Sequence, residues 1–272
     1  MCRITAAIST KAVSIRDLLC EGPKCLFAQA DAVPGMFQDD GWGVARFTNG
    51  APRIIKSPGP ARLEKKAFEK AAAGTSRVTI AHLRDASTPG QVKAELVRPA
   101  NTQPFSGNGI AFGHNGTLYI HKEIRARLGK YAARVKGSND SEVLFWQVMK
   151  MLDACGSPEV AIEMALDEIR AVWNLCKSKY PDRKTPGLGL NMFLASPNSL
   201  TVFCHHPVKK TALLTPGWEW GRIAWRRDND RVVFSSEPAD ARPGWKKMND
   251  KEIASAVIRN GRVDLSFKKV HF

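Results

Sequence analysis

Two consecutive segments with helical spacing lie between strand-rich halves of the sequence, and this order limits the folds open to it. Apolar residues recur at three- and four-residue intervals in 141–154 and again in 158–177. Ser157 before Pro158 is a typical helix start, with serine as the N-cap and proline in the first turn. No linker rich in Pro, Gly or Ser divides the chain. The layout predicts an α+β sandwich in a single domain covering residues 1–272.

The strand-like segments begin at the amino terminus. Apolar and β-branched residues predict strands at 2–9, 41–47, 53–55, 78–82, 109–113, 117–120, 191–194, 200–204, 223–226 and 231–235. Asn49-Gly50 is a hairpin signal. Residues 14–17 fit a capping box that opens a short helix, residues 61–73 fit a helix with Gly74 as its C-cap, and 121–136 is expected to be helical in part.

Bulk composition indicates a globular protein. Hydrophobic residues make up 43% of the 272 residues, and no apolar run approaches the ~18–20 residues of a membrane-spanning helix. Arg3, Lys11 and Arg16 interrupt the amino-terminal segment, which therefore makes a poor secretory signal. We expect a cytoplasmic protein.

The six cysteines are too sparse for a disulfide scaffold. Cys204-His205-His206 resembles a metal-ligand cluster, but neighbouring residues of a strand point to opposite faces and rarely bind one ion. We expect no metal there and no cofactor.

Positive charge is in excess, with 41 Lys and Arg residues against 26 Asp and Glu residues and a net charge of +15. A solvated basic surface explains this, and so does a polyanionic partner. A nucleic-acid-binding protein is therefore the alternative from a different functional class. Its support is a basic segment made of Arg125, Arg127, Lys130, Arg134 and Lys136. No known nucleic-acid-binding motif accompanies that segment.

Cys2 follows the initiator methionine directly. Removal of Met1 would leave a thiol beside a free α-amine, whose ordinary pKa is roughly 7.7–8.0. A base that titrates near the working pH suits general-base catalysis, so one residue can supply both nucleophile and base. Alone, a cysteine at position 2 usually has no such role.

Several short motifs follow Met1-Cys2 in a fixed order. They are Asp40-Gly41-Trp42-Gly43, residues 80–87 (IAHLRDAS), Gln103-Pro104-Phe105, residues 113–118 (GHNGTL) and residues 137–142 (GSNDSE), with weaker segments at 190–194, 232–238 and 244–248. In this order the set resembles the class II glutamine amidotransferases, and most of all the stand-alone YafJ-like branch. The resemblance covers residues 2 to about 250. It implies the four-layer αββα sandwich of the N-terminal-nucleophile hydrolases.

The resemblance also implies roles. Cys2 matches the nucleophile that attacks the side-chain amide of glutamine. Asn115 and Gly116 match the oxyanion hole, through a side-chain NH₂ and a backbone N–H. Arg84 matches the group that binds the substrate α-carboxylate, and Asp140 the group that binds its α-ammonium. Ser87 lies where the family has a small or hydroxylated substrate contact.

The physical chemistry agrees with these roles. One preorganised donor to a tetrahedral oxyanion is typically worth ~3–4 kcal/mol. An arginine can bind both oxygens of a carboxylate.

Each motif has a plainer interpretation. Asn115-Gly116 is also a common hairpin turn, Asp140 before Ser141 could be a helix N-cap, and Arg84 could be a buried ion-pair partner. We expect His82 and His114 to be structural and Trp42 to form a wall of the site. Two positions depart from the family pattern: Gln103 stands where a histidine usually precedes Pro-Phe, and Asn139 where a threonine or serine usually precedes the aspartate. Asp85 stands at a position that varies in related sequences.

The expected reaction is hydrolysis of the glutamine amide through a γ-glutamyl thioester, with release of ammonia. About 20 residues follow the last motif, so we expect the ammonia acceptor to be a separate synthetase subunit, unless the protein is a plain hydrolase. A larger γ-glutamyl amide, as in a related branch that acts in ergothioneine synthesis, is the alternative substrate.

Overall fold

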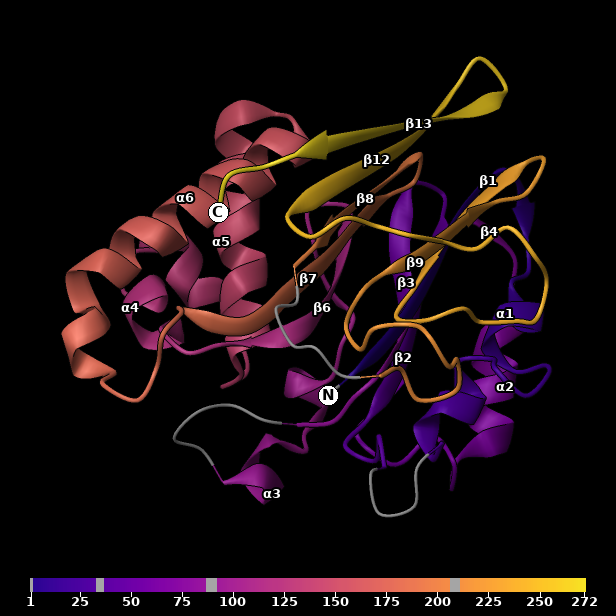
Figure 1. Ribbon diagram of the computed structural model, residues 1–272, viewed down its shortest axis with the longest axis horizontal. Coiled ribbons are helices and arrows are strands. Elements are labelled where there is room, and N and C mark those ends of the chain that lie inside the picture. The colour runs from indigo at the N-terminus through magenta and orange to yellow at the C-terminus, as the bar shows by residue number, and fades with distance from the viewer. Residues whose placement is uncertain (1, 33–36, 87–91, 206–210) are drawn as a thin grey trace.

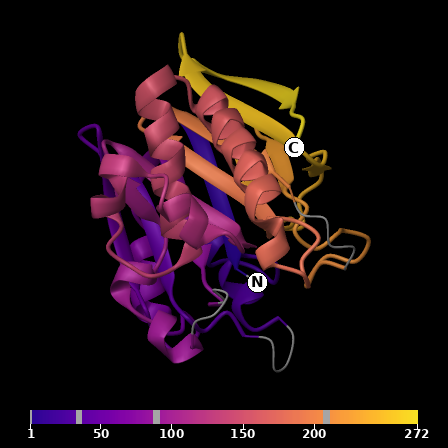
Figure 2. The ribbon, with the colours of Figure 1, turned by 90° about the vertical axis from the view of Figure 1, so that its left-hand side faces the viewer.

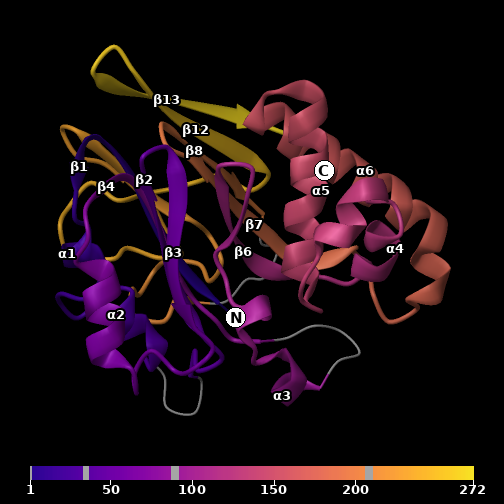
Figure 3. The ribbon, with the colours of Figure 1, turned by 180° about the vertical axis from the view of Figure 1, so that it is seen from behind.

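Two antiparallel sheets stacked face to face form the centre of the computed structural model, which describes residues 2–32, 37–86, 92–205 and 211–272. Helices cover the outer face of each sheet (Figures 1 and 3). The four-layer αββα sandwich implied by the resemblance is therefore confirmed. No helix in the described part of the chain is both long and apolar enough to cross a membrane.

The first sheet has seven strands in the order β11-β9-β10-β1-β4-β2-β3. Their bounds are β1 (Arg3–Val13), β2 (Trp42–Thr48), β3 (Ala51–Ser57), β4 (Ser76–Leu83), β9 (Ala224–Arg227), β10 (Arg231–Ser235) and β11 (Lys246–Lys247). Asn49 and Gly50 form the β2–β3 turn with φ of 51° and 78°, as the hairpin signal predicts. β1 lies in the middle of this sheet, between β10 and β4, so the strand that follows Cys2 is paired on both sides.

The second sheet has six strands in the order β13-β12-β8-β7-β6-β5. Their bounds are β5 (Phe105–Gly107), β6 (Ile110–Leu118), β7 (Gly187–Ser196), β8 (Ser199–Cys204), β12 (Glu252–Arg259) and β13 (Arg262–Lys269). The hairpin of β12 and β13 was not expected from the sequence.

Six α-helices and four short 3-10 helices lie among the described residues. They are α1 (Arg16–Leu19), α2 (Lys65–Ala72), α3 (Lys93–Leu96), α4 (His121–Arg125), α5 (Asp140–Cys155), α6 (Pro158–Cys176), η1 (Phe27–Ala30), η2 (Pro99–Asn101), η3 (Gly129–Arg134) and η4 (Lys177–Lys179). The long pair α5 and α6 lies across the six-stranded sheet (Figure 2). Ser157 caps α6 and Pro158 is in its first turn, as predicted.

Side-chain alternation divides the core into three layers. In β1, Ile4, Ala6 and Ile8 face the layer between the sheets, whereas Ala7 faces the layer under α1 and α2. Residues of α5 and α6 pack on the outer face of the six-stranded sheet, for example Phe145 on Phe112 with ring centroids 5.5 Å apart. Each sheet is thus covered on both faces, which explains its long apolar runs.

Two local predictions are wrong. The N-cap of α1 is Ile15, without a side-chain cap, so the predicted capping box does not form, and Ser14 Oγ instead accepts from the Arg16 N–H at 3.2 Å. The C-cap of α2 is Ala73 rather than Gly74. A Cβ on Gly74 would lie 1.8 Å from Nη1 of Arg46, which donates to the Ala71 carbonyl, so the guanidinium occupies the space that a side chain at position 74 would take.

Candidate active site

Cys2 lies immediately before β1 and is nearly buried, with 8% of its surface exposed. Residues two apart on an extended strand share a face, so Cys2 points the same way as Ile4, into the layer between the sheets. Its Sγ lies 3.6 Å from the Asp85 carbonyl oxygen. Burial raises the pKa of the Cys2 thiol, so the thiol needs a base to become a nucleophile.

Arg84 follows the last residue of β4 and extends its ladder, with its N–H donating to the Gly41 carbonyl at 2.8 Å. Nη1 of its guanidinium donates to the carbonyls of Leu96 at 2.8 Å and Asp40 at 3.3 Å. Arg84 makes no salt bridge with any residue that the structure describes, so the plainer interpretation as an ion-pair partner is not supported. Neutral carbonyls hold a buried cation close to the thiol.

Electrostatics connects Arg84 with the other predicted groups. Burial lowers the pKa of Arg84, while the acidic groups of Cys2, Asp40, Asp140 and Asp85 act in the opposite direction. A guanidinium nevertheless keeps its charge at neutral pH. The Cys2 thiol and the Asp140 carboxylate therefore both lie close enough to the Arg84 guanidinium to interact with its charge.

Asp40 and Lys93 organise the segment after β4, and the sequence interpretation gave neither of them a role. The Asp40 carboxylate accepts from the Ala86 N–H at 2.7 Å and pairs with Lys93 Nζ at 2.8 Å. Lys93 also reaches Asp85 Oδ1 at 3.2 Å. Burial alone would raise the pKa of Asp85, but nearby positive charge, including Lys93, lowers it. Asp40 belonged to a recognised motif, so its position was a signal, whereas Lys93 belonged to none.

Asn115 lies on β6, on the face directed at β1. A Cβ built on Gly113 would lie 3.5 Å from both Ile4 Cδ1 and Ile80 Cγ2, and Asn115 shares that face because it is two residues further on. Its side-chain Oδ1 is buried without a hydrogen-bond partner. Directly opposite in the ladder, Asn191 uses its whole amide: Nδ2 donates to Gly221 and Oδ1 accepts from the His205 N–H. Of these two asparagines, Asn115 is the one whose side-chain amide forms no hydrogen bond with a residue that the structure describes.

Gly116 follows inside β6, so the alternative of an Asn115-Gly116 hairpin turn is wrong. The ladder with β7 shifts register just after Gly116, where Gly189 has a φ of 73°. A Cβ on Gly116 would lie 2.2 Å from the Gly189 carbonyl oxygen and 2.8 Å from His114 Nε2. Backbone crowding therefore requires glycine here, rather than a turn.

Two buried histidines support this part of β6 and its neighbour β4. Burial lowers the pKa of His82 and of His114 to about 3 each, so both are neutral at physiological pH. His114 Nδ1 lies 2.9 Å from Ser141 Oγ. The departure at Gln103 has a clear function in the fold, because its side-chain amide binds both the N–H and the C=O of His114, at 2.6 and 3.1 Å.

Asp140 is the first residue of α5 and is buried, with 3% of its surface exposed. Its carboxylate accepts a hydrogen bond from the Leu118 N–H at 2.6 Å. The N-cap of α5 is Asn139, which accepts from the Glu142 N–H at 2.8 Å, so Asp140 is not the cap. Asn139 also donates to the Asn101 carbonyl at 2.8 Å. The asparagine in place of threonine or serine thus caps the helix and adds a second bond.

Three other predictions have different outcomes. Ser87 lies outside the described residues. Trp42 packs under α2, donating to Glu64 and lying edge-on to Phe68, on the sheet face opposite to Cys2, so its predicted place in the wall of the site is wrong. Cys204 is buried between the sheets, whereas His205 pairs with Asp250 at 3.0 Å, and His206 lies outside the described residues.

Comparisons with known proteins give the same family as the motifs. Residues 25–271 match the model of the family of class-II glutamine amidotransferases. An uncharacterized protein of Methanocaldococcus jannaschii is 30% identical over 121 residues, which are 42% of this chain and 31% of that protein. The chain therefore matches about a third of the length of this relative. The family match begins after Cys2 and does not include it.

Solved structures share the fold. A glutamine aminotransferase class-II domain protein from Silicibacter pomeroyi has a TM-score of 0.63 at 16% identity, with 97% of this chain and 98% of that chain covered. Glutamine phosphoribosylpyrophosphate amidotransferase from B. subtilis has a TM-score of 0.58 at 15% identity, with 97% of this chain but 48% of that chain covered. The chain thus spans about half the length of the B. subtilis enzyme.

The family match covers nearly the whole chain, and the sandwich is that of N-terminal-nucleophile enzymes of this class. The chain therefore belongs to the class-II glutamine amidotransferases.

Proposed function

We propose that the protein hydrolyses the side-chain amide of glutamine, with Cys2 as the nucleophile after removal of Met1. The observation that carries this proposal is the side chain of Asn115, which is buried, uncommitted and on the strand face directed at β1. A buried amide without a partner is costly unless a ligand completes its hydrogen bonds. The side-chain NH₂ of Asn115 donates to no residue that the structure describes, so it is free to donate to the oxyanion that forms when the Cys2 thiol attacks the substrate amide.

In the proposed reaction the α-amine of Cys2, directly or through a water, takes the thiol proton. The thiolate then attacks the γ-amide carbon, and the side-chain NH₂ of Asn115 and the backbone N–H of Gly116 stabilise the oxyanion. The same amine returns the proton to the departing ammonia. Water then cleaves the γ-glutamyl thioester and releases glutamate. The raised pKa of the Cys2 thiol makes the general base necessary.

Substrate binding is proposed to use two opposite charges. Arg84 would bind the α-carboxylate, and Asp140 the α-ammonium. Both residues are buried, and the acidic groups of Cys2 and Asp140 act on the pKa of Arg84. Ser87 is proposed as a further substrate contact. Asp40 positions this clamp by holding both the Arg84 side chain, through its carbonyl, and the Ala86 N–H.

Membership of the family indicates an acceptor for the ammonia but does not identify it. The B. subtilis relative is named as an amidotransferase and is about twice as long as the chain it matches here. We propose that this chain acts with a separate acceptor subunit, as a stand-alone member of the YafJ-like branch. Hydrolysis of a larger γ-glutamyl amide is the competing proposal. Relative kcat/KM for glutamine and for a γ-glutamyl anilide distinguishes the two, because only a site open beyond the amide accepts the anilide.

The decisive experiment is mass spectrometry of the amino-terminal peptide before and after treatment with 6-diazo-5-oxo-norleucine, a glutamine-like electrophile. We expect loss of Met1 and one adduct on Cys2. Cys2→Ala should abolish both the adduct and ammonia release while retaining the fold. Cys20→Ala is the matched control and should keep both. A protein that retains Met1 and takes no adduct, or that releases ammonia normally as Cys2→Ala, would overturn the proposal.

A further inference from the structure

A pocket of about 490 Å³ opens between the edge strands of the two sheets, away from Cys2. β3 is the outer strand of the seven-stranded sheet and β5 that of the six-stranded sheet, and residues of η3 and α5 close the space between them. In Figure 3, β3 lies between α2 and the helices α4 and α5. This volume is within the usual range for small-molecule sites, ~300–1,000 Å³.

Three cations line the pocket: Lys56, Arg134 and Lys136. None of them forms a salt bridge within the described ranges of the chain. Lys56 Nζ donates to the Thr102 carbonyl at 2.6 Å. Burial lowers the pKa of Lys56, the nearby carboxylate of Glu142 acts in the opposite direction, and the charge of Lys136 adds to the effect of burial. With three cations and one carboxylate among its lining residues, the pocket keeps a net positive charge.

Glu142 is the acidic residue among those that line the pocket. Its two oxygens are already engaged, because Oε1 accepts from the Lys136 N–H at 2.9 Å and Oε2 from the Gly137 N–H at 2.6 Å. These bonds fix the loop before α5. The carboxylate forms no salt bridge with the three cations among the described residues, although its charge acts on Lys56.

The remaining wall is apolar and aromatic. Phe105, Phe145 and Trp146 line it, and the rings of Phe145 and Trp146 lie 4.8 Å apart. Arg134 lies over Trp146 at 5.5 Å and Lys56 over Phe105 at 5.6 Å, so the cations lie along the aromatic surface. A Cβ on Gly107 would lie 2.6 Å from Trp146 Cη2, so the glycine lets the indole approach the β5–β6 turn.

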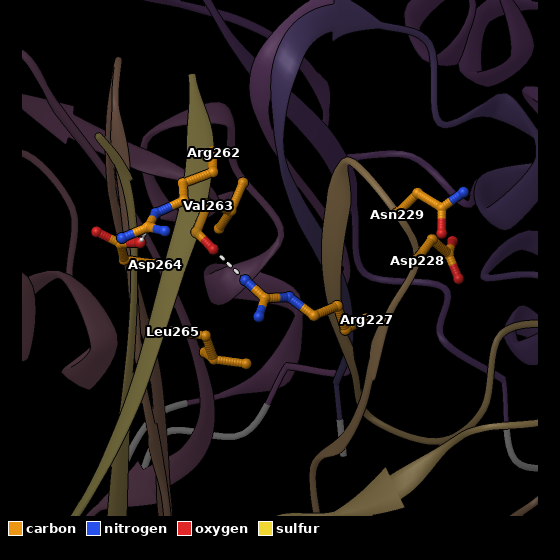
Figure 4. A pocket seen from close by; sticks show the side chains of 7 residues that line it. All are labelled: Arg227, Asp228, Asn229, Arg262, Val263, Asp264 and Leu265. Atoms are coloured by element: carbon orange, nitrogen blue, oxygen red, sulfur yellow. Dashed lines mark hydrogen bonds and ion pairs between the residues drawn. The ribbon is translucent and has the colours of Figure 1, made fainter. Parts of the chain in front are cut away.

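A second pocket, of about 740 Å³, shows the contrasting case (Figure 4). Its arginines are engaged: Arg262 pairs with Asp264 at 3.0 Å, and Arg227 donates to the Val263 carbonyl. Asp228, on its other wall, pairs with Arg226 and Arg231 outside the pocket lining. In that pocket Arg262 has a carboxylate partner, whereas none of the three cations between β3 and β5 forms a salt bridge with a residue that the structure describes.

We propose that the pocket between β3 and β5 binds a small phosphate monoester that also carries an aromatic ring, a class that includes the nucleoside monophosphates. The phosphate lies among Lys56, Arg134 and Lys136, where a dianion gains charge-assisted hydrogen bonds from each cation. The ring lies against the wall formed by Phe105 and Trp146. The two parts of the pocket thus match the two parts of the ligand, and neither part alone explains the other.

The site is independent of the proposed glutaminase chemistry, because none of Cys2, Arg84, Asn115 and Asp140 lines it. Binding should therefore be the same in wild-type protein and in Cys2→Ala. The experiment is isothermal titration of the full chain with AMP, adenosine and inorganic phosphate in separate arms. We expect saturable binding of one AMP, with adenosine and phosphate each binding at least about tenfold more weakly, since each lacks one half of the interaction.

The variant arm replaces the two exposed cations, in the double variant Arg134→Gln with Lys136→Gln. AMP affinity should fall by about tenfold or more, because two charge-assisted bonds are lost. The matched control is Lys122→Gln with Arg125→Gln, two exposed cations of α4, which removes the same net charge away from the pocket and should leave affinity unchanged.

Four results would overturn the proposal. Absence of saturable AMP binding removes the site altogether. Phosphate binding as tightly as AMP means that the aromatic wall contributes nothing, and adenosine binding as tightly as AMP means that the cations contribute nothing. Equal losses in the two double variants mean that the overall positive charge, rather than the pocket, attracts the anion.

Discussion

Asn115 is the residue on which the proposed catalysis depends most directly. Asn115→Ala should lower kcat for glutamine hydrolysis by about 10²- to 10³-fold while changing KM little, because an oxyanion-hole donor acts in the transition state rather than on the bound substrate. The fold should persist, since no hydrogen bond within the described residues involves this side chain and its Oδ1 is unpartnered. Steady-state kinetics together with circular dichroism test this.

Asn191, its neighbour across the ladder, provides the control. Its amide holds Gly221 and His205 in place, so Asn191→Ala should mainly reduce the free energy of unfolding, by roughly 1–3 kcal/mol for the buried groups left unpaired. If Asn115→Ala retains normal kcat, or if it lowers stability as Asn191→Ala does with no specific loss of kcat, Asn115 is a structural residue.

Arg3, the neighbour of the proposed nucleophile Cys2, forms a fully buried ion pair with Glu237, with Nη1 and Oε1 3.6 Å apart. Glu237 also accepts from the N–H groups of Leu213 and Leu214, and Arg3 lies 3.7 Å over the ring of Trp220. Glu237→Gln keeps the shape but leaves the arginine charge uncompensated. The free energy of unfolding should fall by about 3–5 kcal/mol, as measured by urea denaturation.

The exposed pair of Glu219 and Arg222 serves for comparison, because removing its charge as Glu219→Gln should cost at most about 1 kcal/mol. If Glu237→Gln lowered the free energy of unfolding as little as Glu219→Gln, the buried ion pair would contribute no more to stability than the exposed one.

At the scale of elements, the sequence of β6 allows one correct and one wrong prediction. The motif around Asn115 was recognised, but its Asn-Gly pair also fits a turn. What keeps β6 extended is tertiary contact, namely the ladder with β7 and the amide of Gln103 on His114, and neither is readable from local sequence. Arg84 was predicted to bind substrate, whereas Lys93, which contacts Asp40 and Asp85, was given no role.

The carboxyl-terminal hairpin shows a different limit. β12 and β13 turn at Asn260 and Gly261, with φ of 48° and 72°, the same signal that predicted the β2–β3 turn. Residues 253–256 of β12 are buried, but the rest of β12 is not and much of β13 is exposed, so the hydrophobic pattern of the hairpin as a whole is weak even though the turn signal is present. Edge strands are less strongly specified by sequence than central strands such as β1.

Gln103 connects two elements, and its removal should affect both stability and activity. Gln103→Ala leaves the N–H and C=O of His114 without their partner in a buried strand, so unfolding should become easier by roughly 1–3 kcal/mol. Because Asn115 is the next residue, kcat for glutamine should fall as well. Kinetics and urea denaturation measure the two effects separately.

Gln147→Ala is the matched control for Gln103→Ala. Gln147 is also buried and also binds a backbone carbonyl, that of Ala165 in the neighbouring helix. We expect a loss of stability with normal kcat. Equal effects of the two variants on kcat would mean that Gln103 has no particular connection with the oxyanion site.

At the scale of the whole molecule, the proposed site needs both sheets. Cys2 directly precedes β1 and Arg84 directly follows β4 of the seven-stranded sheet, whereas Asn115 and Asp140 come from β6 and the start of α5 on the other side. A single domain, as expected from the sequence, would lose this site in one cooperative step. Ammonia release and circular dichroism should therefore decline together with increasing urea; loss of activity well before loss of structure would indicate separate units.

His82 and His114 are both fully buried in the core, and they should make the stability of the whole fold sensitive to mild acid. Burial lowers the pKa of each to about 3 in the folded protein, whereas an unfolded histidine has a pKa near 6.5. Between these values the unfolded chain binds more protons, so stability is complete above about pH 6.5 and falls as the pH decreases. Each histidine should contribute a slope approaching about 1.4 kcal/mol per pH unit below pH 6. Urea denaturation at pH 7.5, 6.5 and 5.5 measures this slope. A constant free energy of unfolding over that range would show that the two histidines are not buried in neutral form.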